Sequence, residues 1–592
     1  MAQRGKPARP RSPARPRSKA SAATQPKADL ANASATAESD GAFDVAAEPA
    51  FEAFENRYHR GEPQVVFVRL VADLETPVSA YLKLTRDGAT RSSFLLESVE
   101  GGSVRGRYSI IGLKPDVVWR ANGPVAEVNG DPIAAPDTFT REPVATLESL
   151  RALLARSAVT LPEGLPPMAA GVFGYMGYDT IRLVERLPGG KPDDLGVPDG
   201  ILMRPTLIVV FDAVKDEMIV VTPVRPPDGS AGADRTDATA AYCAARQRLA
   251  QVVAALEAPL GASLGAPLGP QLGGGQRAGF RGGDLAAPID ARAMVEPVSN
   301  TPPETFLAMV DKAKDYIRAG DIFQVVLSQR FSAPFPLPPF ELYRALRRTN
   351  PSPYLFHLDL GAFALTGSSP EVLVRVRDGM VTIRPIAGTT RRGSDEREDR
   401  FLADALLADP KERSEHLMLL DLGRNDAGRV ATPGTVEVTE QFIVERYSHV
   451  MHIVSNVTGR LDPAHDVVDA LLAGFPAGTV SGAPKVRAME IIDELELSKR
   501  GPYAGCVGYF SAAGEMDTAI VLRTAIVKDG VVHVQAGAGV VFDSVPENEQ
   551  QECINKAKAV VRAARAAVEI AGGVKPRRNG GNDGNGGAFG SV

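Results

Sequence analysis

The chain has 592 residues, of which 44% are hydrophobic and 6% aromatic, so it is long enough to bury a large core in one big domain or two ordinary ones. Its net charge of −6 and the lack of an apolar run long enough to span a bilayer exclude a general nucleic-acid-binding or membrane protein. Three cysteines, Cys243, Cys506 and Cys553, have no metal-ligand spacing and cannot form a disulfide framework, which predicts a reducing compartment such as the cytoplasm.

Residues 1–50 form a tail rich in Pro, Ala, Ser and Arg, in which eight basic residues precede the first acidic residue, Asp29. We expect this tail to be disordered. A plastid transit peptide is also rich in Ser and Arg, but the regular prolines argue against an amphipathic import helix, so a bacterial low-complexity extension is favoured. No aromatic residues interleave with the charges, as they do in many single-strand-binding segments.

Residues 51–257 form an early folded segment of mixed character. Strand-like runs occupy 64–70 and 206–211, and 240–256 is typical of a helix. Residues 258–291 contain an imperfect four-residue repeat of the Ala-Pro-Leu-Gly type followed by Gly-rich sequence, which we interpret as a low-complexity surface linker.

Residues 292–571 form a later segment in which helices and strands alternate, before a Gly/Asn-rich tail at 572–592 that we expect to be disordered. Helices are predicted at 304–318 and 340–348, strands at 323–331, 362–366, 372–376 and 381–386, and turns at 368–370 and 378–379. Because strands outnumber the helical crossovers that a parallel sheet would need, we expect an α+β fold with large antiparallel sheets.

Two pairs of glutamates have the three-residue spacing that aligns side chains on one helix face: Glu412 with Glu415, and Glu549 with Glu552. Such pairs are common on solvated helix faces. Both helices nevertheless have an apolar side to bury. If both faces line one pocket, four carboxylates meet there, which predicts a divalent cation.

The boundaries of these two helices follow from local signals. The first begins at Pro410, has one apolar side made by Leu417, Leu420 and Leu422, and is expected to stop at the polar residues 423–426. The second begins after the start signal at 544–546 and continues through the Ala/Val-rich stretch 557–567.

Two glycine-rich runs do not predict nucleotide sites. GAGVVF at 537–542 lacks the third glycine of a dinucleotide fingerprint and precedes a turn, and GTVSGAPK at 478–485 has proline where a phosphate loop needs glycine. In the second run, Ser481 or Thr479 is expected to cap a helix that opens at Pro484 and continues to residue 492. Its free amides suit a carboxylate, although a purely structural cap is the alternative.

The run 447–454 is strand-like, which places His449 and His452 on opposite faces. Only one of them can therefore face a pocket. A structural role is the alternative for either histidine.

Seven motifs follow one another along the later segment: PIAGT (385–389), SEHLMLLDLGRND (414–426), SHVMH (448–452), GTVSGAPK (478–485), GPYAG (501–505), GAGVVF (537–542) and PENEQQE (546–552). Together they closely resemble the chorismate-utilising enzymes and, within that family, component I of the anthranilate synthases. The resemblance covers nearly all of the later segment and reaches the early one through LLES at 95–98.

The resemblance implies two large antiparallel sheets packed face to face with helices outside, and a Mg²⁺-dependent reaction on chorismate. It implies that Glu415 and Glu552 are the principal Mg²⁺ ligands, with Glu412 and Glu549 beside them, partly through water. A substrate carboxylate would complete the coordination shell.

The same resemblance implies roles for further residues. Glu371 would protonate the departing ring hydroxyl, His452 would assist the elimination of pyruvate, and Thr479 would lie close by. The residues implied in substrate binding are Arg523 and Tyr503 at a carboxylate, Gly388 and Thr389, and the amides of Gly537, Ala538 and Gly539.

Two positions separate the possible reactions. Aminodeoxychorismate synthase has a nucleophilic lysine where this chain has Ala387, and isochorismate and salicylate synthases have a lysine base near the position of Gln324. The resemblance therefore indicates that ammonia attacks and that anthranilate is the product, in the first committed step of tryptophan biosynthesis. Aminodeoxychorismate synthase component I and a non-catalytic tryptophan-sensing relative are the alternatives.

None of the cysteines has the surroundings of a glutaminase nucleophile, so we expect ammonia from a separate glutamine amidotransferase subunit in a hetero-oligomer. The resemblance also implies feedback inhibition by L-tryptophan, bound between an early and a late element. These elements contain Leu96, Glu97, Ser98, Pro353, Tyr354 and Leu355. A strand end packed on a proline turn is the structural alternative.

Overall fold

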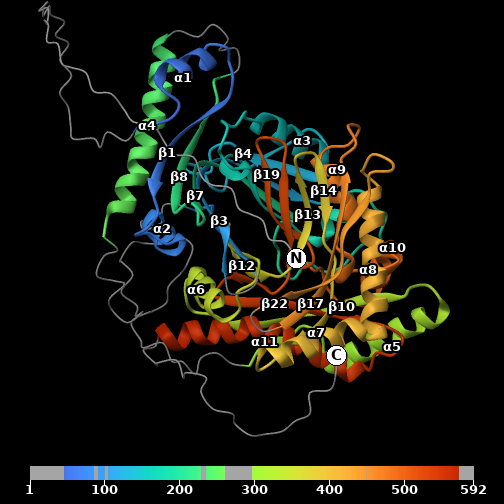
Figure 1. Ribbon diagram of the computed structural model, residues 1–592. Helices are drawn as coiled ribbons and strands as arrows, with labels where there is room; N and C mark the ends of the chain where they lie inside the picture. Colours follow the sequence, from blue (N-terminus) through green and yellow to red (C-terminus); the bar gives the residue numbers. More distant parts are fainter. Residues whose placement is uncertain are drawn as a thin grey trace, which may run out of the picture. The chain divides into compact units, whose positions relative to one another are not determined.

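Strands from the early and late segments pair with one another in one antiparallel network (Figure 1). The computed structural model describes residues 46–85, 91–100, 104–227, 235–259, 296–447 and 450–571. Within these ranges, hydrogen bonding connects 22 strands. The predicted α+β fold with large antiparallel sheets is confirmed.

The network has two arms. In spatial order, the first arm contains β1 (Gln64–Val71), β8 (Glu217–Val224), β7 (Gly200–Asp212), β3 (Val104–Asn122), β2 (Ser93–Glu100), β11 (Tyr354–Asp359), β12 (Ala364–Ser369), β21 (Thr524–Lys528), β22 (Val531–Val540) and β10 (Gln324–Pro334), with β9 (Val298–Ser299) and β18 (Gly482–Ala483) beside β10. The second arm contains β5 (Thr140–Arg141), β4 (Val125–Asn129), β3, β7, β6 (Gly171–Met176), β19 (Cys506–Ser511), β20 (Met516–Ile520), β13 (Val372–Arg377), β14 (Met380–Ile383) and β17 (Val450–Arg460), which also pairs with β15 (Ile386–Arg391) and β16 (Glu437–Arg446).

The two longest paired strands, β3 and β7, belong to both arms. The first half of β3 pairs with β2, and its second half pairs with β4. The register between β3 and β7 shifts between Pro115 and Val117, next to Lys114 with its positive φ of 48°. Such an irregularity lets a strand bend. The two sheets implied by the resemblance are therefore continuous through these strands.

Side chains alternate along the strands between two apolar cores. On β1, Val65 faces the core between the arms, whereas Val66 faces a core shared with helices. This period of two is what strand geometry requires. Between the arms, Phe94 of β2 stacks on Phe173 of β6 with ring centroids 4.6 Å apart. The arms therefore pack face to face.

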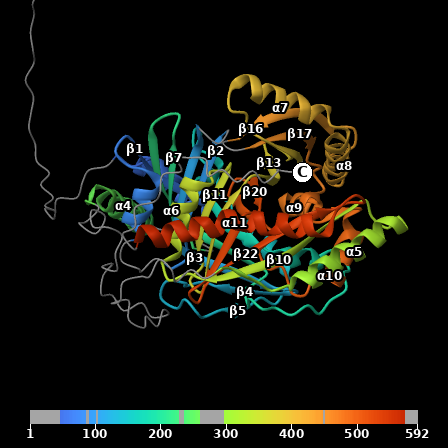
Figure 2. The ribbon, with the colours of Figure 1, turned by 90° about the horizontal axis from the view of Figure 1, so that it is seen from below.

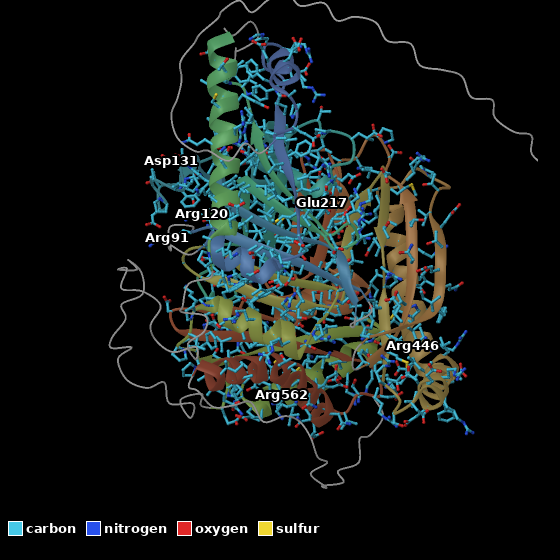
Figure 3. The ribbon with its side chains drawn as sticks, turned by 60° about the vertical axis from the view of Figure 1, so that its left-hand side comes forward. Arg91, Arg120, Asp131, Glu217, Arg446 and Arg562 are labelled. Carbon is cyan, nitrogen blue, oxygen red and sulfur yellow. The ribbon has the colours of Figure 1, made fainter. Side chains whose placement is uncertain are left out.

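Helices cover the outer faces of both arms. One helical group shares the core that contains Val66 of β1 and Met218 of β8: α1 (Phe51–Tyr58), α2 (Pro77–Leu84), α4 (Arg235–Glu257) and α6 (Pro339–Thr349). Within this group, α6 packs against β11 and β12. The others are α3 (Thr146–Ser157), α5 (Pro303–Ala319), α7 (Glu396–Ala408), α8 (Pro410–Gly428), α9 (Val467–Gly474), α10 (Lys485–Leu495) and α11 (Pro546–Ala571). Figure 2 shows α11 lying across β22 and β10. Charged side chains such as Asp131, Arg446 and Arg562 lie at the surface (Figure 3).

Most predicted elements of the folded segments are present. The helices expected at 240–256, 304–318 and 340–348 are α4, α5 and α6, and the strands expected at 64–70 and 206–211 lie within β1 and β7. Within the described part of the chain, no helix has both the length and the hydropathy that a bilayer crossing needs.

Three predicted boundaries are wrong. The single strand expected at 381–386 is divided into β14 and β15, because Pro385 cannot donate to a ladder. The turn expected at 368–370 begins later, since Ser368 and Ser369 still belong to β12. The stop expected at 423–426 does not end α8, which continues to Gly428.

The last five residues of the predicted N-terminal tail, 46–50, belong to the fold. Glu48 forms a β-bridge with Phe67, and the carbonyl oxygen of Pro49 accepts a hydrogen bond from Tyr242 at 2.8 Å. The rest of the predicted N-terminal tail, nearly all of the predicted linker and the C-terminal tail lie outside the described residues.

Candidate active site

Glu371 is a buried carboxyl group in the short connection between β12 and β13, with 6% of its surface exposed. The Thr479 hydroxyl lies 3.1 Å from both of its oxygens and donates to the carboxylate. Burial raises the pKa of Glu371 to about 8, although the Thr479 hydrogen bond, the positive charge of Arg523 and a backbone hydrogen bond from Ile386 act in the opposite direction. Glu371 therefore holds a proton at neutral pH and can donate it.

His452 lies on β17 directly opposite Thr389 of β15. Its Nδ1 atom is 3.1 Å from the carbonyl oxygen of Gly388 and 3.0 Å from the Thr389 hydroxyl. A carbonyl oxygen only accepts, so Nδ1 carries the proton and Nε2 keeps a lone pair. Burial, with a smaller contribution from Arg523, lowers the pKa of His452 to about 4, so the ring is neutral at pH 7 and Nε2 can accept a proton.

Arg523 follows β20 and has a positive φ of 48°. Burial lowers the pKa of this guanidinium, whereas the nearby Glu371 and Tyr447 raise it. Among the described residues its side chain makes no hydrogen bond or ion pair. An arginine that lies beside the candidate acid without a partner is suited to bind a carboxylate in two-point geometry.

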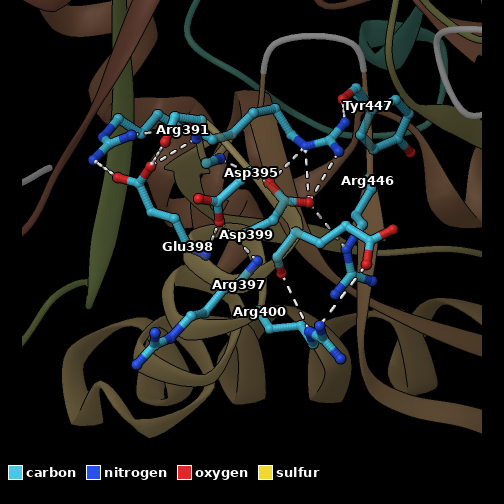
Figure 4. A network of polar contacts seen from close by, with 12 residues as sticks. Arg391, Asp395, Arg397, Glu398, Asp399, Arg400, Arg446 and Tyr447 are labelled. Carbon is cyan, nitrogen blue, oxygen red and sulfur yellow. Dashed lines mark hydrogen bonds and ion pairs between the residues drawn. The ribbon is translucent and has the colours of Figure 1, made fainter.

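Tyr447 lies near this arginine, whose pKa it raises. A network of charged residues at α7 reaches Tyr447 (Figure 4). Arg392, which follows β15, donates to the carbonyl oxygen of Tyr447 at 2.6 Å and pairs with Asp399 of α7 at 2.9 Å. Arg446 lies 3.4 Å from the same carboxylate. The network fixes the end of β16 to the end of β15, close to Thr389 and His452.

Two glycines of β22 direct their amides away from the neighbouring strand. Their partners on β10 are Ser328 for Gly537 and Val326 for Gly539. The amides of Ser328 and Val326 bond outside this strand pair, to Glu496 and Ser481, so these are non-hydrogen-bonded pairs. In such pairs the N–H groups of both glycines also point outward.

Ala538 has a different role from that expected. It alternates with the two glycines, so its amide faces Leu327 of β10 and is used by the ladder. The expectation that all three amides of 537–539 reach a ligand is therefore wrong for Ala538. The β21 ladder ends at Val534, so the outward-facing amides of Gly537 and Gly539 have no strand beside them.

The side of β22 that carries these glycines also supports two polar groups. A Cβ atom on Gly537 would lie 2.8 Å from the Tyr503 hydroxyl, and one on Gly539 would lie 2.7 Å from Nε2 of Gln324. Gln324 in turn donates to Oε1 of Glu415 at 3.2 Å. A continuous polar surface therefore links Tyr503 to the first glutamate pair.

Gly388 connects the other side of the site to the same pair. It has a positive φ of 67° and sits where the register of β15 and β17 shifts, and a Cβ here would lie 2.9 Å from Oε2 of Glu412. A side chain at this position would be strained and crowded. Glycine thus lets Glu412 approach the strand that carries Thr389.

Both glutamate pairs lie on half-buried helix faces, Glu412 and Glu415 on α8 and Glu549 and Glu552 on α11. Burial raises the pKa of Glu412 and that of Glu549, and the second carboxylate of each pair adds to the effect. Lys411 of α8 lowers the pKa of Glu549, which shows that the starts of the two helices lie near each other.

The donor set suits Mg²⁺, although the four carboxylates do not form one cluster. Within the described ranges, no three His, Cys, Asp or Glu side chains lie close enough to hold one ion. Glu552 is paired with Lys556 at 2.5 Å. Mg²⁺ keeps several waters, needs only one or two protein carboxylates together with a ligand anion, and prefers oxygen donors, which is the donor type that these glutamates supply.

Comparisons with known proteins identify the family. The chorismate binding enzyme family matches residues 94–562. The chain belongs to this family. Anthranilate synthase component 1 of Cereibacter sphaeroides is 53% identical over 517 residues, which cover 87% of this chain and 97% of that protein.

Two solved structures are similar to this chain in fold. Anthranilate synthase component I from Streptococcus pneumoniae TIGR4 is 37% identical, with a TM-score of 0.63 over 83% of this chain and 99% of that chain. The menaquinone-specific isochorismate synthase from Escherichia coli is 20% identical with a TM-score of 0.60 over 87% of this chain and 99% of that chain, and it shows the fold alone.

The two elements expected to bind tryptophan are paired strands in this chorismate-binding enzyme. Leu96, Glu97 and Ser98 of β2 lie opposite Phe356, Leu355 and Tyr354 of β11, respectively. The Glu97 carboxylate is already held by Arg347 at 2.6 and 3.0 Å and by the Tyr343 hydroxyl. Glu97 therefore anchors α6, and the Tyr354 hydroxyl accepts from Arg375 at 3.2 Å, so Ser98 is the more available polar group. Pro353 directly precedes β11.

Thr479 and Ser481 do not cap the helix as expected. The N-cap of α10 is Pro484 without a side-chain hydrogen bond, and Ser481 instead donates to the carbonyl oxygen of Ala477 at 2.8 Å. Thr479 is used by Glu371. His449 lies outside the described residues, so its predicted orientation stays a prediction.

Sequence reasoning missed two residues beside the site, Tyr447 and Arg500. Tyr447 begins the run 447–454 that contains His452, but its position beside Arg523 depends on the strand pairing. Arg500 lies four residues after Glu496, a spacing that signals an ion pair, but a surface pair is the usual reading of that spacing.

Proposed function

We propose that this chorismate-binding enzyme converts chorismate and ammonia into anthranilate and pyruvate, as component I of an anthranilate synthase. The observation that carries the proposal is the arrangement of a protonated Glu371 beside the unpartnered Arg523 and the neutral His452. Arg523 binds a substrate carboxylate, Glu371 protonates the departing hydroxyl, and His452 accepts the proton that is removed in the elimination of pyruvate.

The reaction takes place in two steps. Ammonia forms a C–N bond to the ring, and the ring hydroxyl leaves as water with the proton of Glu371. In the second step Nε2 of His452 removes the ring proton and the C–O bond to the enolpyruvyl group breaks as the ring becomes aromatic. The departing enolpyruvate takes up a proton at its methylene carbon and is released as pyruvate, which balances the proton held by His452. Acid/base groups of this kind typically contribute about 10²–10⁴-fold each.

Binding is assigned to groups with free hydrogen-bonding capacity. Arg523 and the Tyr503 hydroxyl bind one carboxylate, supported by the amides of Gly537 and Gly539. The other carboxylate lies toward the glutamates, where Glu415 and Glu552 are the proposed principal Mg²⁺ ligands and Glu412 and Glu549 assist them. When bound, Mg²⁺ supplies electrostatic stabilisation of the substrate carboxylate.

Two positions favour ammonia over the alternative chemistries. Ala387 is a buried strand residue opposite Ile453 and offers no amine for covalent attack, which speaks against aminodeoxychorismate synthase. Gln324 uses its amide on Glu415 and cannot act as the base that activates water. A non-catalytic tryptophan sensor would not need the Glu371–Thr479 pair.

The ammonia is proposed to come from a separate glutamine amidotransferase subunit. Cys506 and Cys553 are buried, and burial raises the pKa of each thiol to about 12. Such thiols are poor nucleophiles. Neither of these two cysteines can therefore act as an activated glutaminase nucleophile. Glutamine alone should not sustain activity in the purified chain.

The test is anthranilate fluorescence with chorismate, ammonium and Mg²⁺. We expect a signal that depends on chorismate and on ammonium and is lost when EDTA removes the metal. Formation of an aminodeoxychorismate product in place of anthranilate would overturn the proposal, as would activity of the purified chain with glutamine and no ammonium.

A further inference from the structure

Arg500 and Glu496 form one of the most deeply buried ion pairs described in the protein. Their side chains are 1% and 5% exposed. Nε of Arg500 donates to Oε2 at 2.9 Å, and Nη2 donates to Oε1 at 2.6 Å. The carboxylate is thus held in two-point geometry.

The same guanidinium ties two backbone segments of the candidate site together. Nη1 donates to the carbonyl oxygen of Val480 at 2.7 Å, and Nη2 donates to that of Val326 at 2.7 Å. Val480 directly follows Thr479, the partner of Glu371. Val326 lies on β10 opposite Gly539.

Arg500 also contacts the ring of a residue assigned to substrate binding. Its guanidinium carbon lies 5.6 Å from the centroid of Tyr503 and 4.7 Å from that of Tyr178. Cation–π contacts at these distances favour one ring position over others. The Tyr503 hydroxyl is held over Gly537, where a Cβ atom would lie 2.8 Å away.

Glu496 extends the junction to the strand beneath the glycines. Its Oε1 atom accepts from both the amide and the hydroxyl of Ser328, each at 2.8 Å. Ser328 lies directly opposite Gly537. The ion pair therefore joins β10, the Thr479 turn and the Tyr503 ring.

We infer that Arg500 is a positioning residue for this reaction: with Glu496 it holds Thr479 against Glu371 and the Tyr503 hydroxyl over Gly537, without touching the substrate. The inference rests on the proposed function. Arginine suits this role because four acceptors lie in different directions around one planar fork, and a lysine ammonium is a compact point charge that cannot reach them together.

The decisive variant is Arg500→Lys, which keeps the positive charge beside Glu496. We expect kcat/KM for chorismate to fall about 10²-fold, since small displacements of positioning groups have effects of this size. Part of this loss should appear as a higher KM for chorismate, because the Tyr503 hydroxyl that binds substrate would be displaced. In addition, the alkaline limb of the pH profile of kcat, where kcat falls as Glu371 loses its proton, should move to higher pH. A displaced Thr479 no longer stabilises the charged form of Glu371, so the same shift is expected in Thr479→Val.

Controls separate positioning from folding. Arg204→Lys weakens another arginine pair, 2.7 Å from Asp116 and remote from these residues, and should leave both the KM and the pH limb unchanged. If Arg500→Lys does not fold, Glu496→Gln keeps the shape and weakens the same pair, and it should shift the KM and the limb in the same directions.

Three results would contradict these proposals, and each can be told from the others. A folded Arg500→Lys or Glu496→Gln protein whose KM and pH limb match those of the parent chain would overturn the positioning role. A parent chain that forms no anthranilate would instead overturn the proposed function. A loss of folded protein in Arg500→Lys, with an unchanged KM and limb in Glu496→Gln, would assign the pair to stability alone.

Discussion

At Glu371, burial and hydrogen bonding act on the acidity of the carboxyl in opposite directions. Burial raises its pKa to about 8, and the Thr479 hydroxyl lowers it from what burial alone would give. A general acid works only while protonated, so we expect kcat to fall as the pH rises above about 8. Removing the hydrogen bond raises the pKa further.

The corresponding measurement is the pH profile of kcat with saturating chorismate, ammonium and Mg²⁺. Thr479→Val should move the alkaline limb to higher pH, and Glu371→Gln should lower kcat about 10²–10⁴-fold and abolish the limb. A limb that persists in Glu371→Gln would show that another group, or the ammonium ion itself, sets it.

His452 is expected to act through Nε2, because Nδ1 is occupied by the carbonyl oxygen of Gly388. His452→Ala should reduce anthranilate formation about 10²–10⁴-fold without abolishing it. Because the proposed role is in the second step, rapid quenching should reveal accumulated amino intermediate. An unchanged rate would remove this histidine from the mechanism.

The proposed roles of individual residues come from motifs, but the motifs did not predict the surroundings of those residues. The pairing of Glu371 with Thr479 joins positions more than a hundred residues apart in the chain, and no local pattern predicts it. Helix-capping rules assigned Thr479 and Ser481 to α10, because those rules see only neighbours in sequence. In the folded protein Thr479 instead donates to the buried carboxyl group of Glu371, which needs a hydrogen-bond partner.

Among the elements, β22 is the strand whose glycines border the proposed binding groups Tyr503 and Gln324. In Gly537→Ala, the new Cβ would lie 2.8 Å from the Tyr503 hydroxyl and 2.9 Å from the carbonyl oxygen of Leu327. The second contact is with backbone and cannot be relieved by rotating a side chain. We expect KM for chorismate to rise about tenfold or more.

Gly130→Ala is the matched control, because a Cβ there would meet nothing within 4 Å. Its kinetics and thermal stability should match those of the parent chain. If Gly537→Ala also kept the parent KM, then the Tyr503 hydroxyl would not contribute to binding as proposed.

The pairing of β2 with β11 gives the proposed tryptophan site a specific test. Ser98 lies opposite Tyr354 at the point where the early and late elements meet. Ser98→Ala should raise the tryptophan concentration for half-inhibition about tenfold, within the range of allosteric coupling, and leave the uninhibited rate intact. Equal inhibition of variant and parent would exclude Ser98 from the site.

Element boundaries were predicted well where local signals agreed with packing and poorly where they did not. The apolar periodicities of α4 and α5 and the apolar run of β1 sufficed, because each helix buries one continuous face and β1 is buried on both of its faces. The polar run at 423–426 suggested a helix end, yet Asp426 is buried in an ion pair with Lys485 at 2.8 Å and α8 continues. Leu417, expected on the apolar side, is 54% exposed.

At the scale of the whole molecule, the two predicted segments cannot be independent domains. The ladders between β2 and β11 and between β6 and β19 cross from one segment to the other. Each segment alone would expose unpaired strand edges, which favour aggregation. Antiparallel sheets were predictable from strand content, but this exchange of strands was not, because long-range pairing leaves no periodic signal in the sequence.

We therefore expect the two fragments made by cutting the chain between residues 259 and 296 to fold only in each other's presence. Residues 46–259 and 296–571, produced separately, should be insoluble or lack a cooperative thermal transition, whereas the two produced together should copurify and form anthranilate with ammonium. A monomeric, cooperatively unfolding fragment from either half would contradict this dependence.

The strand exchange also has a consequence for synthesis on the ribosome. Strands β2 and β6 emerge early but pair with β11 and β19, which are made only after the intervening linker. Until then the nascent chain carries open sheet edges whose partners do not yet exist. Because long-range strand pairing is slow, the sheet edges of the early segment stay open until β11 and β19 have been made, and its folding cannot be completed before the late segment is synthesised.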